Sequence, residues 1–412
     1  MLNTVIIIDN QSYPLGGTAQ VAYSSAIELS KRGYHVVYIA ADKEANPDLI
    51  AAGVDVKTIY NPSINRNPNK FDVLIHGLWS KKMEREALKL LSEQDKTTSI
   101  IHVHGYLHCF SPSVLKACKL SGIKTVLTLH DYFIVCPSGG FYNFKTHKIC
   151  KLDPMSLACL ICNCDKRSYI QKIWRILRQR GVSKYAKNNK DLSLIYISEF
   201  SFSKMKDSLM DKHSVYFVRN PYDVGTGTKY EAEKSQNYVF LGRISEGKGI
   251  DIFCEAFTDL IHNKQIKGKA IVVGDGETRR SMEQKYPEIT FLGWKKHEEF
   301  DEIFVNARAL VFPSRWYEGA PLTPIEFMSK GIPCIVSDSN SGKDYLTEGK
   351  DGIIFRSEDI EDLKEKVMLV EDNNYWGQIC RCLRATFDID SFTVTRHVDN
   401  LLATYEEIIG NN

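Results

Sequence analysis

The sequence predicts an α/β protein built from two doubly wound domains that face a cleft. Three observations carry this prediction. The chain has 412 residues, which is more than one ordinary hydrophobic core accommodates. Short apolar runs alternate with helical patterns, and this alternation predicts parallel sheets covered on both faces. The alternation stops near Pro221 and begins again at Tyr238, which predicts two separate sheets.

The N-terminal half contains six runs that are typical of buried strands. Between the first two, Val21, Ala22 and Leu29 fall on one face of a helix expected from Thr18 to Arg32. The predicted strands cover residues 5–9, 35–40, 73–76, 100–104, 125–130 and 194–198.

The second half repeats this alternation after a polar stretch rich in Gly, Thr, Lys and Glu. Its predicted strands and helices cover residues 238–242, 250–261, 270–273, 290–292, 309–312, 324–330 and 334–337. The expected parts of the chain are therefore a domain at 1–222, a linker at 223–237, a domain at 238–385 and a C-terminal segment at 386–412. We expect the helix of that last segment to pack back across both domains. Because ligands of open α/β sheets bind beyond the carboxyl ends of the strands, the site is expected in the cleft.

Composition excludes several classes of protein. Apolar residues make up 43% and charged residues 25% of the chain, which are values of globular proteins. A net charge of +2 does not indicate nucleic-acid binding. No apolar run has membrane-spanning length, and the start MLNTVIIIDN reads as a buried strand and not as a signal peptide. We therefore expect a cytoplasmic protein whose 11 cysteines are reduced thiols or metal ligands.

Two glutamates, Glu318 and Glu326, lie eight positions apart around a Pro-containing turn. The segment TPIE has the form of a capping box, with Thr323 at the N-cap, and that role alone would explain Glu326. Glu318 lies just after a predicted strand, where strand end, loop and helix N-terminus form an anion pocket. Glycoside hydrolases also use two carboxylates, but the doubly wound pattern argues against that class.

A second candidate site is the loop GRISEGKG at 242–249, between a predicted strand and a helix. Its glycines let the backbone approach a ligand, and Arg243 and Lys248 can point into the same cleft. A diphosphate leaving group requires such fixed positive charge as its bond breaks. The alternative is a solvated basic turn, but the position at the carboxyl end of a strand favours a site.

Three further strand ends carry candidate residues. Gly16 and Gly17 precede the first helix and suit a phosphate or a sugar held by backbone N–H groups. They do not form GxGxxG, and no acidic residue clearly ends the second strand, so NAD binding is not indicated. Gly274 lies in another strand-end turn, VGDG. His130 ends a strand beside the cleft; a lone histidine is more often structural, but this placement favours function.

An insertion is expected at 136–190, and it is rich in cysteine. Cys159 and Cys162 form a CxxC with zinc-like spacing, and Cys164 follows. Cys150 or Cys136 could complete a set of four ligands. The alternative is a group of small buried thiols, because the second half lacks a matching CxxC.

The segment at 166–190 is strongly basic and contains no acidic residue. Ile170, Ile173, Trp174 and Leu177 fall on one helical face, a pattern typical of an interfacial helix on anionic lipid. A helix packed on the N-terminal domain, with its basic face in water, explains the pattern equally well. Both interpretations stay open.

Together these motifs resemble the family 4 glycosyltransferases of the GT-B fold. The resemblance covers nearly the whole chain and is strongest from Tyr238 to Asp338. The matching residues are Gly16 and Gly17, Leu129-His130-Asp131, Leu241-Gly242-Arg243, Lys248-Gly249, Val273 to Gly276, Phe291 to Gly293, Pro313-Ser314 and the pair Glu318 and Glu326 with its E-x7-E spacing. The resemblance implies two Rossmann-like domains, the first on the acceptor side and the second on the side of a nucleotide-sugar donor.

The resemblance also implies the chemistry and the role of each candidate residue. The expected reaction transfers a sugar from a UDP or GDP donor to an acceptor, with retention at the anomeric carbon and usually without a metal. Arg243 and Lys248 would hold the diphosphate, and Glu326 the ribose. Glu318 would contact the hydroxyls of the donor sugar. Supporting roles fall to His130 in the sugar site, to Gly16, Gly17 and Gly274 in close backbone approaches, and to the N–H groups of Ala320, Leu322 and Thr323.

The resemblance points to bacterial surface polysaccharides. We expect a glycan or lipid-linked acceptor in O-antigen, capsule or exopolysaccharide synthesis, and peripheral contact with the inner face of the cytoplasmic membrane through 166–190. A sugar-nucleotide epimerase of the same fold and a non-catalytic nucleotide-sugar-binding subunit are the alternatives. The charged residues Arg243, Lys248, Glu318 and Glu326 argue against the non-catalytic subunit, because a protein without activity has no leaving group to neutralise.

Overall fold

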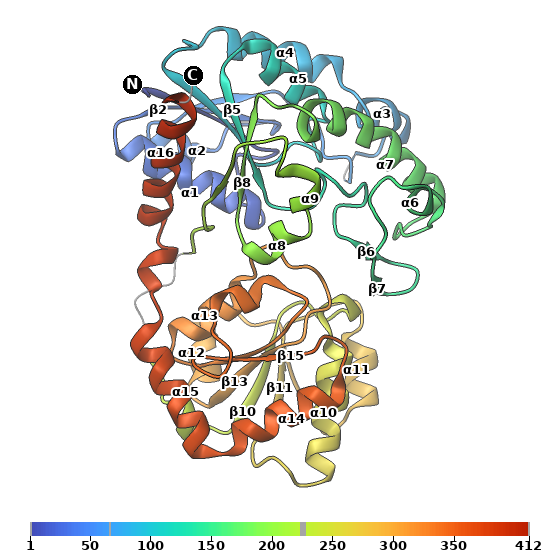
Figure 1. Cartoon of the computed structure of the whole chain (residues 1–412), viewed down its shortest axis with the longest axis vertical. Coiled ribbons are helices and arrows are strands. Elements are labelled where there is room, and N and C mark those ends of the chain that lie inside the picture. Colours follow the sequence, from blue (N-terminus) through green and yellow to red (C-terminus); the bar gives the residue numbers. More distant parts are fainter. Residues whose placement is uncertain (1, 66, 223–227, 411–412) are drawn as a thin grey trace.

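The computed structural model describes residues 2–65, 67–222 and 228–410. Within them, two separate parallel sheets form the upper and lower halves of Figure 1. The first sheet has the strand order β3-β2-β1-β4-β5-β8-β9 and the second the order β12-β11-β10-β13-β14-β15. Both orders reverse direction beside the first strand of their half, as in doubly wound folds. The predicted fold class is therefore confirmed.

The first sheet is buried on both faces by helices of the N-terminal half and by α16 (Val394–Gly410) from the end of the chain. Val5 and Ile7 of β1 pack with α1 and α16, whereas Ile6 and Ile8 pack with α4 and α5. The strands are β1 (Thr4–Ile8), β2 (His35–Ala40), β3 (Asp55–Thr58), β4 (Ser99–Val103), β5 (Lys124–Leu129), β8 (Leu192–Tyr196) and β9 (Val215–Phe217). The helices are α1 (Gly17–Lys31), α2 (Pro47–Ala51), α3 (Lys70–His76), α4 (Lys81–Ser92), α5 (Ser113–Ser121), α8 (Glu199–Ser203) and α9 (Lys206–Leu209).

Between β5 and β8 the chain leaves the sheet. This excursion contains the two-stranded hairpin β6 (Tyr142–Asn143) and β7 (Lys148–Ile149), then α6 (Leu157–Ile161) and α7 (Tyr169–Val182). The hairpin extends toward the lower half (Figure 1), where His147 Nδ1 lies 2.6 Å from Glu246 Oε2.

The second sheet has its own core. Its strands are β10 (Asn237–Leu241), β11 (Ala270–Val273), β12 (Thr290–Gly293), β13 (Ala307–Phe312), β14 (Cys334–Ser337) and β15 (Ile353–Phe355). Its helices are α10 (Ile250–His262), α11 (Arg279–Lys285), α12 (Phe300–Phe304), α13 (Leu322–Ser329), α14 (Ile360–Glu371) and α15 (Asn373–Thr386). In the predicted linker, residues 223–227 lie outside the described residues, and Ala232–Lys234 form a short 3-10 helix.

The chain returns to the upper half at its end. Trp376 and Leu383 of α15 belong to the core of the second sheet, but α16 (Val394–Gly410) packs on α1 beside the first sheet (Figure 1). His397 Nε2 lies 3.1 Å from Ser25 Oγ of α1, and Tyr405 Oη lies 2.5 Å from His102 Nδ1 of β4. The expected crossing therefore exists, with one helix on each half.

One predicted strand is wrong, and five short strands were not predicted: β6 and β7 of the hairpin, and β3, β9 and β15 of the two larger sheets. Residues 73–76 lie in α3, whose N-cap Asn69 accepts hydrogen bonds from two backbone N–H groups of the first turn. No residue of α3 is buried, so this apolar run serves neither sheet. The missed strands β3, β9 and β15 have three or four residues each, which is too short for a clear pattern.

Candidate active site

The loop that carries Glu318 is held by a set of buried serines. It leaves β13 at Phe312 and reaches α13 at Leu322. Ser337 Oγ donates to the carbonyl oxygen of Ser314 at 2.6 Å, and Ser341 Oγ donates to the carbonyl oxygens of Glu318 and Gly319 at 2.8 and 2.9 Å. These bonds fix the backbone beside Glu318. These serines were not predicted, because their only signal in the sequence is a Ser-rich run at the end of a strand.

Glu318 and Lys248, both predicted site residues, are brought together. Lys248 Nζ lies 2.6 Å from Glu318 Oε1, and Ser314 Oγ donates to the same oxygen at 2.7 Å. The two side chains are 25% and 15% exposed, so the pair remains open to a ligand. A lysine and a glutamate from two different loops thus meet at the carboxyl ends of β10 and β13, which are neighbours in the sheet.

Glycines allow these two loops to pack without a gap. Gly249 has φ +72°, and a Cβ there would collide with the carbonyl oxygen of Pro313. A Cβ on Gly247 would collide with the indole of Trp316. The carbonyl oxygen of Gly247 accepts a hydrogen bond of 3.0 Å from the N–H of Arg315. The spacing between Lys248 and Glu318 therefore depends on these glycines.

Arg243 and Gly274 lie at the ends of adjacent strands. Gly274 has φ +135°, and a Cβ there would collide with the carbonyl oxygen of Gly242. Arg243 follows Gly242 and is exposed, and it makes no ion pair with any residue that the structure describes. Its guanidinium is available to an anionic ligand.

The capping box predicted for Glu326 is wrong. Helix α13 begins at Leu322 with Pro321 at the N-cap, so Thr323 is the second helical residue and Glu326 the fifth. Pro324 fits inside the first turn, where a missing N–H breaks no helical bond. Glu326 is buried, and the N–H groups of Leu322 and Thr323 lie in the first turn, where helices bind anions.

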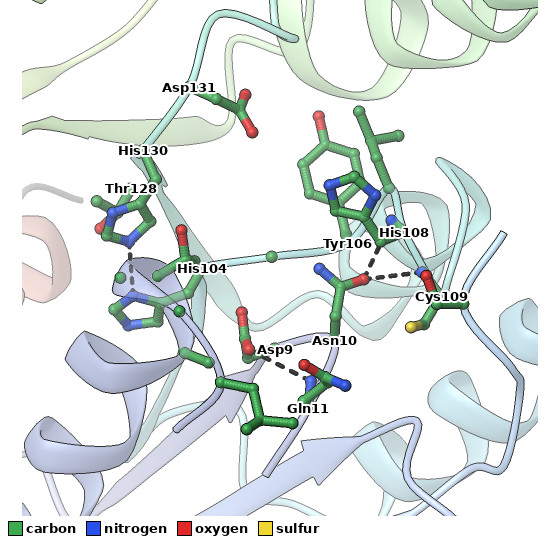
Figure 2. A pocket seen from close by; sticks show the side chains of 18 of the residues that line it. Asp9, Asn10, Gln11, His104, Tyr106, His108, Cys109, Thr128, His130 and Asp131 are labelled. Atoms are coloured by element: carbon green, nitrogen blue, oxygen red, sulfur yellow. Dashed lines mark hydrogen bonds between the residues drawn. The ribbon is translucent and has the colours of Figure 1, made fainter. Parts of the chain in front are cut away.

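A pocket of about 340 Å³ lies in the upper half and includes three predicted residues, Gly16, Gly17 and His130. Figure 2 shows His130 beside His104, with 3.0 Å between His130 Nε2 and His104 Nδ1. Desolvation lowers the pKa of His130 to about 3, so the imidazole is neutral at neutral pH. His104 and Asp9 were not predicted as site residues, although each ends a predicted strand.

The two halves meet at the Glu318 loop. A Cβ on Gly319 would lie 3.2 Å from the carbonyl oxygen of His130. Tyr317 packs its ring near those of Tyr132 and Phe200 of the upper half. The strand ends of both sheets therefore face one another here, which places His130 next to the loop that pairs Glu318 with Lys248.

The cysteines of the excursion are not arranged as predicted for zinc. Lys172, 1% exposed, lies between them, with its Nζ 3.1 Å from Cys164 Sγ and 3.7 Å from Cys159 Sγ. Among the described residues, no three His, Cys, Asp or Glu side chains are grouped to hold a metal ion. Cys150 and Cys162 are only partly buried. The ammonium group of Lys172 therefore contacts two of the candidate zinc ligands.

The two facing doubly wound sheets, with their charged strand ends, define a protein of the GT-B fold. The family model described as Glycosyl transferases group 1 matches residues 228–381, and that described as Glycosyltransferase Family 4 matches residues 15–160. Together the two matches cover more than half of the chain. The chain belongs to the family 4 glycosyltransferases, as its motifs predicted.

Curated relatives match over part of their length. The UDP-Gal:α-D-GlcNAc-diphosphoundecaprenol α-1,3-galactosyltransferase of Escherichia coli is 27% identical over 188 residues, 43% of this chain and 48% of that protein. An α-1,4-N-acetyl-D-galactosaminyltransferase of Campylobacter jejuni, named for an undecaprenol-PP-linked acceptor, is 26% identical over 248 residues, 54% of this chain and 65% of its own. The chain thus spans about half to two thirds of these relatives.

Solved structures share the fold along the whole chain. HepE of Anabaena in complex with UDP has a TM-score of 0.66 at 14% identity and covers 98% of this chain and 100% of its own. The sucrose-phosphate synthase of Thermosynechococcus elongatus has a TM-score of 0.66 at 14% identity, with 100% of both chains covered. At this identity the likeness establishes the fold.

Proposed function

We propose that the protein transfers a hexosyl unit from a nucleotide-diphosphate sugar to a glycan or lipid-linked acceptor, with retention at the anomeric carbon. The observation that carries this proposal is the Lys248–Glu318 pair, held by two interlocked loops next to His130. Residues 238–385 would bind the donor and residues 1–222 the acceptor. A UDP-type donor fits the UDP-galactose named for the relative of Escherichia coli and the UDP bound to HepE of Anabaena.

In this proposal the leaving group is stabilised by fixed charge. Lys248 and Arg243 bind the diphosphate, Gly274 lets it approach the backbone, and the N–H groups of Ala320, Leu322 and Thr323 support it. Lys248 exchanges its contact with Glu318 for phosphate oxygens, and Glu318 turns to hydroxyls of the donor sugar. Glu326 holds the ribose. Each of these groups thus contacts the donor, whereas a salt bridge with only a structural role would contact no ligand.

Transfer then proceeds on one face of the sugar. The bond between the anomeric carbon and the diphosphate oxygen breaks, and the acceptor hydroxyl attacks from the same side. The departing phosphate oxygen takes the proton of that hydroxyl, so no separate base is required. Gly16 and Gly17 allow close approach of the upper half, and neutral His130 donates or accepts a hydrogen bond in the sugar site.

Lys248→Ala tests this assignment. We expect sugar transfer to fall by a factor on the order of 10² to 10³, the usual loss when one group that stabilises a developing charge is removed. The thermal stabilisation by UDP should shrink in the same variant. Lys295→Ala is the matched control, because Lys295 forms a similar 2.8 Å pair with Glu299 on the surface. Near-normal transfer by Lys248→Ala would exclude the proposal, and product formed without any acceptor would indicate an epimerase.

We also propose that the upper half docks on an anionic lipid surface, where a lipid-linked acceptor resides. Helix α7 buries Trp174, Arg178 and Val182, as the packed-helix interpretation requires. Trp174 therefore does not share the exposed face that was predicted for it, and lipid contact through the remaining exposed side chains stays a proposal. The exposed apolar side chains of α3, α6 and α7 form what we call the three-helix surface: Phe71, Leu74, Ile75, Leu157, Ile161, Ile170, Ile173 and Leu177. No helix among the described residues is long and apolar enough to cross a membrane.

Position and charge support this docking surface. Figure 1 places α3, α6 and α7 along one edge of the upper half, and Trp174 Nε1 donates to the carbonyl oxygen of Leu74 at 3.0 Å, which joins α3 to α7. The exposed Lys70, Arg167 and Arg180 lie on the same helices or next to them. Basic side chains beside exposed apolar ones are the composition that anionic lipid attracts.

Co-sedimentation with vesicles tests the docking proposal. The double variant Ile170→Ser/Leu177→Ser should bind vesicles of anionic lipid about tenfold more weakly than the wild type, because buried apolar area is lost. Ile50→Ser in α2 is the control, since Ile50 is 55% exposed and lies away from these helices. Equal weakening by both variants, or equal binding of the wild type to neutral and anionic vesicles, would refute the docking surface.

A further inference from the structure

The pocket of the upper half contains a buried carboxylate oxygen with no partner. Asp9, at the end of β1, is 2% exposed. Its Oδ2 accepts a hydrogen bond of 3.3 Å from the N–H of Gln11, but its Oδ1 bonds to no described residue. Figure 2 shows this carboxyl group on the inner wall of the pocket, between His104 and Asn10.

A second buried polar atom lacks a partner in the same pocket. His104, just after β4, is 4% exposed, and its Nδ1 is taken by the contact with His130. Its Nε2 makes no hydrogen bond with the described part of the chain. Since β1 and β4 are neighbours in the sheet, Asp9 and His104 come from adjacent strand ends.

The backbone nearby is shaped to leave this carboxyl group room. A Cβ on Gly105 would collide with Asp9 Oδ1, so the turn after β4 passes directly beside the carboxylate because it carries no side chain. A buried polar atom without a hydrogen-bond partner lowers the stability of the fold. In a pocket without a ligand, water molecules can form the missing hydrogen bonds. Two such atoms line this pocket, and the turn at Gly105 leaves room beside one of them. Together these features indicate a ligand that supplies the missing hydrogen bonds.

We propose that Asp9 and His104 form a subsite that binds a neutral, hydroxyl-bearing sugar unit of the acceptor. A sugar hydroxyl can donate to Asp9 Oδ1 and, with a neighbouring hydroxyl, donate to or accept from His104 Nε2 in either tautomer. When the Asp9 carboxyl group is ionised, a phosphate or carboxylate offers it no proton and is repelled by it. This inference rests on the glycosyltransferase function proposed above.

The position of the subsite assigns it to the acceptor. All residues that line the pocket belong to the upper half, whereas Arg243, Lys248 and Glu318 belong to the lower half. His130 lies between the two groups, with its ring nitrogen on His104 and its carbonyl oxygen beside Gly319. A donor held by the lower half reaches His130, and the acceptor sugar fills the space beyond it.

Ligand-detected NMR with simple glycosides tests the subsite without requiring turnover. The probes are methyl α-N-acetylglucosaminide, methyl α-galactoside and methyl α-glucuronide, each with UDP present. At pH 8, where Asp9 is ionised, we expect a neutral glycoside to bind the wild type and the anionic glucuronide not to. Asp9→Ala and Gly105→Ala should both weaken that binding by about tenfold or more, the usual effect of losing a hydrogen bond to a charged group.

Controls separate this inference from the proposed function. Thermal stabilisation by UDP should be unchanged in Asp9→Ala and Gly105→Ala, because the donor groups lie in the other half. Asp9→Asn, which keeps the shape, guards against misfolding, and Asp191→Ala removes a carboxylate that is 78% exposed outside the pocket. Undiminished binding of the glycoside by Asp9→Ala, absence of binding by the wild type, or preference for the glucuronide would overturn the subsite. Loss of UDP stabilisation in Lys248→Ala alone bears only on the proposed function.

Discussion

At the scale of single residues, the pocket of the upper half buries ionisable side chains. Asp9 illustrates the consequence, because burial raises the pKa of its carboxyl group to about 7, and Asp42 adds a repulsive contribution. The neighbouring His104 is neutral, since burial lowers its pKa well below the usual value. A residue kept in this state at a cost in stability is typical of a binding site, where the ligand supplies the missing partner.

Asp9→Asn should change the pH dependence of stability in one direction. A raised folded-state pKa means that the folded protein binds this proton more tightly than the unfolded chain. Stability from Asp9 is therefore present below about pH 4 and is lost as pH rises through about 7. We expect Asp9→Asn to have a higher Tm than the wild type at pH 8, with the difference shrinking toward pH 5.

Thermal unfolding of both proteins from pH 5 to pH 8 measures this effect. Histidines titrate in the same range, but they are common to both proteins and cancel in the difference. His102, His104 and His130 in particular have lowered pKa values and oppose the effect of Asp9 in the wild type. Parallel Tm curves for the two proteins would show that Asp9 does not titrate in this range.

At the scale of elements, two loops control the distance between Lys248 and Glu318. Gly249→Ala tests this control, because it combines a left-handed φ of +72° with a collision against Pro313. We expect a loss of about 2–4 kcal/mol in unfolding free energy, and a larger relative loss of transfer activity. Gly33→Ala is the matched control: its φ is +86°, but its Cβ would meet nothing within 4 Å.

Chemical denaturation and transfer assays distinguish the two glycine variants. Gly33→Ala should cost only about 1 kcal/mol, the backbone strain alone, and should leave activity unchanged. The excess loss in Gly249→Ala then belongs to the displacement of the loop after β13. Similar losses of stability and activity in both variants would mean that the contact with Pro313 does not position the pair.

Strands that are covered on both faces were predictable from the sequence, whereas contacts between separate elements were not. Central strands such as β2 and β14 coincide with their predicted ranges, because continuous apolar runs of that length fit a covered parallel sheet. The run at 73–76 is equally apolar, yet Asn69 begins a helix there. Likewise Lys248 and Glu318 were each predicted from strand-end position. The serines that hold the Glu318 loop come from the end of β14 and from the 3-10 helix after it, and they carry no motif.

At the scale of the whole molecule, the chain joins its two halves twice. It crosses once between β9 and β10 and once between α15 and α16. The second crossing brings α16 onto the first sheet, where Val398, Leu401, Tyr405 and Ile408 are buried in the same core as α1. The upper half is therefore completed by residues from the far end of the sequence, and its stability depends on them.

Removal of residues 394–410 should uncouple the halves. Four buried apolar side chains would be lost, each worth about 1.5–3 kcal/mol, and together they approach the whole stability of an ordinary domain. The lower half keeps its own core, to which α15 belongs but α16 does not. We expect calorimetry of the truncated chain to show the upper half unfolded or melting far earlier, while the transition stabilised by UDP persists. Tyr405→Phe should shift the first transition only slightly, because it removes the contact with His102 and keeps the ring. A single transition at the wild-type temperature in the truncated chain would mean that the first sheet is closed by its own helices alone.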